Sequence, residues 1–272
     1  MKVAAIQMVS EVSCQANLLS AAELIQQASE EGAELVVLPE YFCILGAVDT
    51  DKLDIKESFG QGPIQEMLAA AARRHNIWLV GGTLPLEVPG DNSRVYNSTL
   101  VFNPQGKCVA RYDKMHLFKF KKGVEQYDES RTLVPGTAPA VFDLKSLDGN
   151  SWRIGLSICY DIRFPEFYRT LTDLGTDLVL VPSAFTQTTG AAHWEVLLRA
   201  RAIENQVWVL AAAQGGTHQN SRKTWGQSMV VSPWGQVVSQ LATGPGCVIA
   251  EINKTELASV RTNLPALEHR TL

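Results

Sequence analysis

Glu40, Lys114 and Cys159 are the residues whose types and settings suggest chemistry, because each stands beside a predicted apolar strand. A thiol must lose its proton to attack a carbonyl carbon, and a carboxylate can accept that proton. An ammonium group lowers the pKa of a neighbouring thiol and can stabilise the oxyanion of a tetrahedral intermediate. A carboxylic acid can then protonate a leaving amine and activate water. Together the three residues predict hydrolysis of a C–N bond through a thioester.

Cys159 stands where a predicted strand gives way to a helix. Residues 153–158 alternate and are mostly apolar, as in a buried strand, whereas Phe164-Pro165-Glu166 is typical of a first helical turn. Proline suits that turn because its missing N–H would have no partner there. Such a tight turn lifts one side chain out of the sheet, and the backbone N–H of Tyr160 can face a developing oxyanion. The alternative is a buried structural cysteine.

The other two residues also have structural alternatives. Glu40 could be a solvated loop residue, and Lys114 could form a surface pair with Asp113. The rival chemistry is a Cys–His pair, for which His116 is the candidate because it lies two residues from Lys114. The sequence alone leaves these alternatives open.

Composition argues against several other kinds of protein. The chain has 272 residues, of which 46% are hydrophobic and 19% charged, and its net charge is −4, so neither a nucleic acid nor a membrane surface is an expected partner. Its five cysteines are scattered without a C-x-x-C pair, which argues against a metal site or a disulfide framework and for a reducing compartment. The first eight residues are typical of a strand, not of a signal peptide, and no apolar run is long enough to span a membrane. We expect a cytoplasmic protein.

An internal repeat predicts the fold. Three segments recur in the same order: residues 32–42 at 175–185, residues 76–80 at 206–210, and the hairpin 98–109 at 228–238. We infer two pseudo-equivalent halves, each a sheet covered by helices on one face, with the other two faces packed together. This is an α/β fold, an α-β-β-α sandwich. Because Ser146–Asn150 is only a turn and no linker separates the halves, residues 1–272 are expected to form one domain.

The elements that must position the chemistry follow from local patterns. Strands are expected at 2–8, 35–38 and 77–82, helices at 17–31 and 63–75, and a hairpin at 95–112, followed by a long irregular stretch from Lys119 to Pro139. Glu40 follows a strand of the first half, and Cys159 ends a strand of the second. Ligands gather at the carboxyl ends of such strands, so the two residues are expected to meet there.

The motifs around these residues resemble a known family. Leu38-Pro-Glu40, Lys114-Met-His-Leu117 and the segment from Cys159 to Glu166 resemble the three signatures of the nitrilase superfamily of carbon–nitrogen hydrolases. The resemblance spans essentially the whole chain and implies the same sandwich fold. It implies Glu40 as general base, Lys114 as oxyanion stabiliser and Cys159 as nucleophile, and it places the family's second glutamate, which positions the lysine and the substrate, at Glu129. It implies no cofactor, and it implies at least a homodimer formed through a helical face, to which apolar positions on a helix at 191–205 contribute.

Within the superfamily, residues 183–206 resemble the amidases of small acids, and residues 211–218 and 261–270 are closer to the deaminated glutathione amidase branch than to the ω-amidases. A nitrilase, an N-carbamoyl amino acid amidohydrolase and a catalytically idle interaction module remain alternatives. The expected substrate is a small linear amide that carries a carboxylate. Arg163 is either half of a buried ion pair with Glu166 or the group that holds this carboxylate. The predicted substrate-binding residues are Tyr41, His116, Tyr160, Arg163, Phe185 and Thr186.

Overall fold

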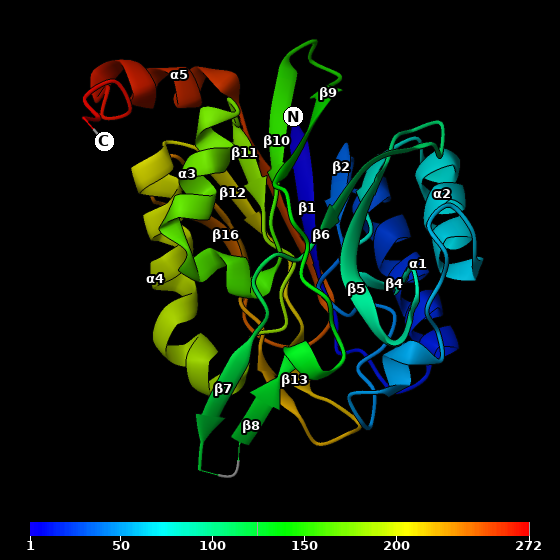
Figure 1. Cartoon of the computed structure of the whole chain (residues 1–272). Coiled ribbons are helices and arrows are strands. Elements are labelled where there is room, and N and C mark those ends of the chain that lie inside the picture. Colours follow the sequence, from blue (N-terminus) through cyan, green and yellow to red (C-terminus); the bar gives the residue numbers. More distant parts are fainter. Residues whose placement is uncertain (124, 272) are drawn as a thin grey trace.

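Two β-sheets lie face to face between two layers of helices in the computed structural model, which describes residues 1–123 and 125–271 (Figure 1). The first sheet has the order β17-β1-β2-β3-β5-β4, with β6 also paired to β5. Its strands are β1 (Lys2–Gln7), β2 (Leu35–Val37), β3 (Trp78–Val80), β4 (Leu84–Val88), β5 (Asp91–Phe102), β6 (Cys108–Asp113) and β17 (Gly246–Glu251).

The second sheet repeats this arrangement in the order β16-β15-β12-β11-β10-β9. Its strands are β9 (Ala140–Lys145), β10 (Ser151–Leu156), β11 (Leu178–Leu180), β12 (Trp208–Ala211), β15 (Ser228–Val231) and β16 (Val237–Leu241). Three parallel strands form the centre of each sheet, β1-β2-β3 and β10-β11-β12, and an antiparallel strand flanks them on either side. The predicted repeat and the sandwich fold are confirmed, and the repeat extends to the pairs β1/β10 and β17/β9, which the sequence comparison did not detect.

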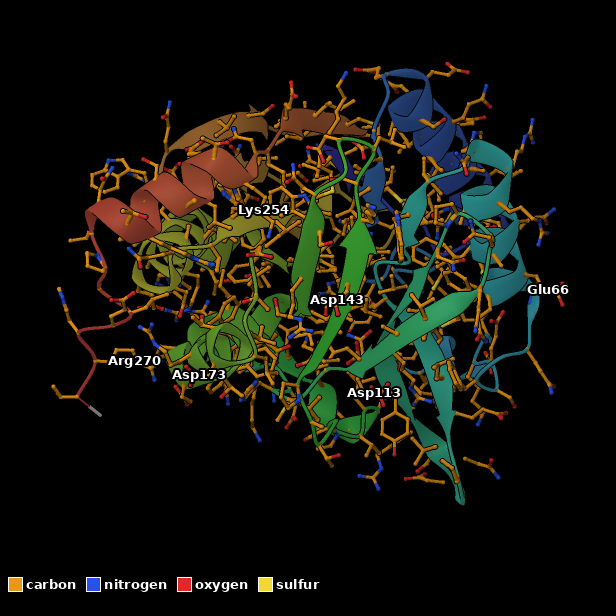
Figure 2. The ribbon with its side chains drawn as sticks, turned by 90° about the horizontal axis from the view of Figure 1, so that it is seen from above. Glu66, Asp113, Asp143, Asp173, Lys254 and Arg270 are labelled. Atoms are coloured by element: carbon orange, nitrogen blue, oxygen red, sulfur yellow. The ribbon has the colours of Figure 1, made fainter. Side chains whose placement is uncertain are left out.

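Helices cover the outer face of each sheet. Helices α1 (Cys14–Glu30) and α2 (Pro63–His75) pack on the first sheet, and α3 (Pro165–Asp173) and α4 (Gln187–Asn205) lie over the second. Seen from above, Glu66 of α2 and Asp173 of α3 lie on opposite sides of the molecule, with Asp143 of β9 between them (Figure 2). Helix α5 (Lys254–Asn263) lies near the C-terminus on the side of the second sheet.

Strand β1 shows how the sequence builds the two cores. Val3 and Ala5 point between the sheets, into a cluster that includes Ile154, whereas Ala4 and Ile6 point toward α1 and join Ile25. Because both faces of the strand are covered, the strand is apolar throughout instead of alternating with polar residues. The same burial on both sides applies to β2 and β11, each a run of apolar residues.

One stretch differs from the prediction. Residues 119–139 are not irregular: β7 (Lys119–Lys122) and β8 (Glu125–Asp128) form an antiparallel hairpin, and a 3-10 turn, η2 (Glu129–Arg131), follows it. Two further 3-10 turns, η1 (Asp51–Leu53) and η3 (Cys159–Arg163), and a second hairpin of β13 (Gly215–Thr217) with β14 (Lys223–Trp225) complete the described elements. Within residues 1–123 and 125–271, no helix is both long enough and apolar enough to cross a membrane.

Candidate active site

Cys159 is held in a strained turn at the end of a buried strand. Strand β10 ends at Leu156, and Cys159 opens the turn η3 with a φ of 47°, which is left-handed and uncommon for any residue other than glycine. Its backbone N–H donates to the Pro182 carbonyl at 2.9 Å. Pro165 begins α3 as predicted. The backbone conformation of this turn therefore fixes the orientation of the Cys159 side chain. Only 8% of the residue is exposed.

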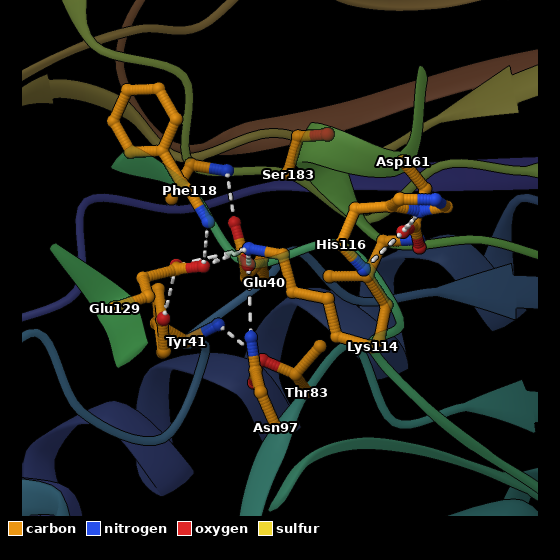
Figure 3. A network of polar contacts seen from close by, with 12 residues as sticks. Glu40, Tyr41, Thr83, Asn97, Lys114, His116, Phe118, Glu129, Asp161 and Ser183 are labelled. Carbon is orange, nitrogen blue, oxygen red and sulfur yellow. Dashed lines mark hydrogen bonds and ion pairs between the residues drawn. The ribbon is translucent and has the colours of Figure 1, made fainter. Parts of the chain in front are cut away.

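Glu40 is not a solvated loop residue, because it is 1% exposed and its carboxylate accepts three hydrogen bonds. Oε1 accepts from Asn97 Nδ2 and from Lys114 Nζ, both at 2.9 Å, and Oε2 accepts from the backbone N–H of Ala184 at 3.0 Å (Figure 3). The next residue, Tyr41, also has a left-handed φ, of 56°, and its N–H donates to Thr83 Oγ1 at 2.8 Å. The loop after β2 is thus fixed by contacts from both halves of the molecule.

Lys114 follows β6 and bridges two carboxylates instead of pairing with Asp113. Its Nζ lies 2.9 Å from Glu40 Oε1 and 2.8 Å from Glu129 Oε2, and the residue is 1% exposed. Glu129 also accepts from the Tyr41 hydroxyl at 2.8 Å and from the Phe118 backbone N–H at 2.7 Å (Figure 3). The β7–β8 hairpin brings Glu129 to this place, because η2 begins where β8 ends.

The three buried charges set one another's ionisation. Burial alone lowers the pKa of the Lys114 ammonium, but Glu129 and Glu40 together raise it well above its ordinary value, so the group stays charged. Burial raises the pKa of both carboxyls. For Glu129, the charge of Lys114 and the hydrogen bonds from Phe118 and Tyr41 outweigh burial, so its pKa is lowered. For Glu40, burial prevails and the pKa stays raised. Glu40 is therefore the more basic of the two carboxylates and the better proton acceptor.

The pKa of the Cys159 thiol is raised, although a neighbouring ammonium was expected to lower it. Burial, and then the negative charge of Glu40, raise its pKa well above the ordinary value, and the opposing influence of Lys114 is smaller. The resting site therefore holds a neutral thiol beside a carboxylate, a state in which attack and proton transfer can occur together.

A pocket of about 340 Å³ opens onto these groups. Cys159, Glu40 and Glu129 line it, and five of the six predicted substrate-binding residues do so as well: Tyr41, Tyr160, Arg163, Phe185 and Thr186. Asn97 and the N–H groups of Ala184 and Phe118 were not predicted, since nothing in the sequence pattern distinguishes the residues that hold a carboxylate from their neighbours.

The structure does not place His116 as predicted, and it excludes one of the two alternatives for Arg163. His116 does not line the pocket, and its Nδ1 lies 2.7 Å from Asp161 Oδ1 (Figure 3). Its ring stacks on that of Phe164 with the centroids 3.7 Å apart. It is therefore placed neither as a base for Cys159 nor as a substrate-binding residue. Arg163 forms no ion pair with Glu166, which is exposed; its guanidinium lies 3.3 Å from His193 Nδ1 instead.

Comparisons with known proteins agree with this geometry. The sequence profile of the family described as carbon–nitrogen hydrolase matches residues 2–262. A protein of Synechocystis sp. named deaminated glutathione amidase is 43% identical over 98% of this chain and 97% of its own length, and Omega-amidase NIT2-A of Xenopus laevis is 37% identical over 93% and 89%. The solved structure of Nit3 of Saccharomyces cerevisiae, a member of branch 10 of the nitrilase superfamily, superposes with a TM-score of 0.89 at 32% identity and covers 100% of this chain and 97% of that one. The chain belongs to the carbon–nitrogen hydrolase family of the nitrilase superfamily and is a hydrolase of C–N bonds other than peptide bonds.

Proposed function

We propose that this chain is an amidase that hydrolyses deaminated glutathione through a thioester on Cys159. The observation that carries the proposal is the pocket in which a thiol and two carboxylates meet, with a buried ammonium fixed between the carboxylates. The relative of Synechocystis sp. that carries this name is similar over nearly its whole length, which supports the choice of substrate. Deaminated glutathione is an α-keto acid joined by an amide bond to cysteinylglycine.

The proposed reaction begins at the neutral thiol. As the Cys159 sulfur forms a bond to the amide carbon, the Glu40 carboxylate takes the thiol proton, and the oxyanion faces the Lys114 ammonium and the Tyr160 N–H. Glu40 then returns the proton to the amide nitrogen as the C–N bond breaks, releasing cysteinylglycine. Water, deprotonated by Glu40, attacks the thioester, and the collapse of the second intermediate frees the keto acid and restores the thiol. Glu129 has a positioning role, since it holds the Lys114 ammonium in place.

Arg163 is proposed to hold the carboxylate of the acyl group. It lies on the same turn as Cys159 and lines the pocket, and among the described residues its guanidinium has no carboxylate partner. The rings of Tyr160 and Phe185 lie 5.7 and 5.4 Å from it and partly shield it from water. A substrate methylated at this carboxylate should be hydrolysed far more slowly, and Arg163→Ala should narrow the difference. Equal kcat/KM for acid and ester would contradict this role.

The test of the proposal is a comparison of products. The purified chain should release cysteinylglycine from deaminated glutathione with a higher kcat/KM than that for ammonia release from α-ketoglutaramate, and mass spectrometry should detect an acyl adduct on Cys159. A preference for α-ketoglutaramate would favour the second candidate, an ω-amidase, which the similarity to the Xenopus laevis protein supports. Absence of both turnover and adduct would indicate that the chain is a catalytically idle interaction module.

We also propose a homodimer, one domain and a cytoplasmic location. The helical face of the second half exposes Val196 and Ile203 of α4 beside Trp234 and Val238, an apolar surface suited to a second copy. Light scattering that gave the mass of one chain, 29.8 kDa, would contradict the dimer.

One domain is supported by the hydrogen bond from Ala184 to Glu40, which joins the halves. The cytoplasm is supported by the five cysteines, all free.

A further inference from the structure

A second hollow, of about 550 Å³, adjoins the catalytic pocket. The two share the wall residues Tyr41, Phe118, Glu129 and Arg222, so the outer hollow lies directly beside the pocket that holds Cys159. A group bound at the reacting end can therefore extend into the outer hollow. What the outer hollow can recognise depends on the charged groups in its wall.

Two cations in this wall have no carboxylate partner among the residues described. Lys52 of η1 donates to Thr132 Oγ1 at 3.2 Å and lies 5.5 Å from the centroid of the Tyr41 ring. The guanidinium of Arg222 lies 4.9 Å from the centroid of the Tyr127 ring. Burial lowers the pKa of Lys52; the charges of Glu129 and Asp49 oppose this shift, and the charge of Arg222 adds to it. Two partly buried cations that form no ion pair with a carboxylate favour an anion between them.

The acidic residues of the same wall form no ion pair with Lys52 or Arg222. Glu129 is held by Lys114, Tyr41 and Phe118, and Asp128 pairs with Lys119 at 2.9 Å. Asp49 lies on an exposed segment at the rim, where water screens its charge. The outer hollow therefore keeps two cations that are free to pair with the carboxylate of a ligand.

We propose that Lys52 and Arg222 bind the carboxylate at the far end of the leaving group. The inference rests on the proposed function. The substrate carries two carboxylates, one on the acyl group and one on the glycine of cysteinylglycine. Arg163, on the turn of the nucleophile, is placed for the first, and the adjoining outer hollow offers Lys52 and Arg222 to the second. The outer site thus selects amides whose leaving group is a peptide acid over amides that release ammonia.

Binding to a Cys159→Ala variant tests the site without turnover. Calorimetry should show deaminated glutathione binding about tenfold or more tightly than its glycine carboxamide, since a hydrogen bond to a charged group is worth about that factor. Lys52→Met and Arg222→Gln, each added to that variant, should remove most of this difference. Lys223→Gln, which removes an exposed positive charge one residue away, is the matched control and should keep it. Equal affinity for acid and carboxamide, or no binding of either, would overturn the proposal.

Kinetics on the active protein separate this inference from the proposed function. In Lys52→Met and Arg222→Gln, the ratio of kcat/KM for deaminated glutathione to that for α-ketoglutaramate should fall about tenfold or more, mainly through KM. Arg222→Lys should restore part of the ratio, and thermal melting should confirm folding. An equal loss on both substrates would place the acyl carboxylate at these cations and overturn the proposal. If the wild type ignored deaminated glutathione while Cys159→Ala still preferred acid over carboxamide, the function would fail and the site would stand.

Discussion

Glu34 of the first half and Asp177 of the second make equivalent hydrogen bonds to the strand beside them. The carboxylate of Glu34 accepts from the Lys2 N–H at 3.1 Å, and that of Asp177 accepts from the Arg153 N–H at 2.9 Å. In both halves the backbone N–H of the acid returns a bond of 2.8 Å to the same strand. The two halves therefore match in contacts between their central strands as well as in the order of those strands.

The same register shows where the halves differ. Val3 pairs with Leu35, and Ile154 pairs with Leu178. Counting five residues onward from each of these four shows which residues are equivalent in the two halves. Met8 is equivalent to Cys159, and Glu40 is equivalent to Ser183. Met8 is buried in the core, and the hydroxyl of Ser183 donates to the Val181 carbonyl at 3.3 Å. Each half thus has one reactive group and one structural residue at the two equivalent positions.

Lys114, the third reactive residue, is also present in only one of the two halves. Ser98 pairs with Asp113 in the first sheet, and Ser228 pairs with Leu241 in the second, so Lys114 corresponds to Ala242. Neither half alone carries a thiol, a base and an ammonium at these strand ends. The difference shows that the chemistry is a property of the interface between two similar scaffolds, and that substitutions at equivalent positions should have very unequal effects.

The largest inequality is expected between Cys159→Ala and Met8→Leu. Removing the nucleophile should lower kcat by at least about 10⁴-fold, as in other enzymes that form covalent intermediates, whereas Met8→Leu conserves volume and should cost less than about 1.5 kcal/mol of stability with little change in kcat. Steady-state rates and thermal melting measure both. Substantial turnover by Cys159→Ala would show that the thiol is not the nucleophile.

The next inequality is between Glu40→Gln and Ser183→Ala. Glu40→Gln leaves the shape intact but removes the proton acceptor, so kcat should fall about 10²–10⁴-fold. Lys114→Met should cost about 10²–10³-fold through loss of the oxyanion donor. Ser183→Ala removes a weak hydrogen bond and should change kcat by no more than a few-fold. A Lys114→Met variant within a few-fold of wild type would contradict the role of that ammonium.

Much of this comparison could be predicted from the sequence, because strand ends and repeats leave clear patterns. The segments around β2 and β11 are similar enough to align by eye, and Glu40, Lys114 and Cys159 each follow an apolar run. The β7–β8 hairpin could not be predicted, since each of its strands has only four residues, which is too few to establish an alternating pattern. The partners of Glu40 are Asn97 and a backbone N–H, and proximity of this kind depends on how the two sheets pack. The contact of His116 with Asp161 could not be predicted for the same reason.

A smaller effect should appear in the reactivity of the resting thiol. The Glu40 carboxylate of the first half raises the pKa of the Cys159 thiol in the second, so Glu40→Gln should lower that pKa. A lower pKa means more thiolate at pH 8, and alkylation of Cys159 by iodoacetamide should become several-fold faster although turnover is lost. Peptide mass spectrometry follows the rate, and Ser183→Ala is the control. Slower alkylation in Glu40→Gln would contradict a thiol held neutral by this carboxylate.

The smallest inequality concerns two helix caps. Ser13 caps α1 and Thr186 caps α4, and each side-chain oxygen accepts a backbone N–H at 3.3 Å. Replacing either residue by Ala should lower the free energy of unfolding by about 1 kcal/mol. Only Thr186 lines the catalytic pocket, so only Thr186→Ala should also raise KM by a few-fold, and Thr186→Ser should restore both quantities because it keeps the hydroxyl. Ser13 is exposed on the opposite helical layer, so an equal change of KM in Ser13→Ala would mean that the effect comes from general loosening of the fold. Chemical denaturation and steady-state kinetics on the same preparations separate the two contributions, since capping acts on stability in both halves while contact with the substrate belongs to one.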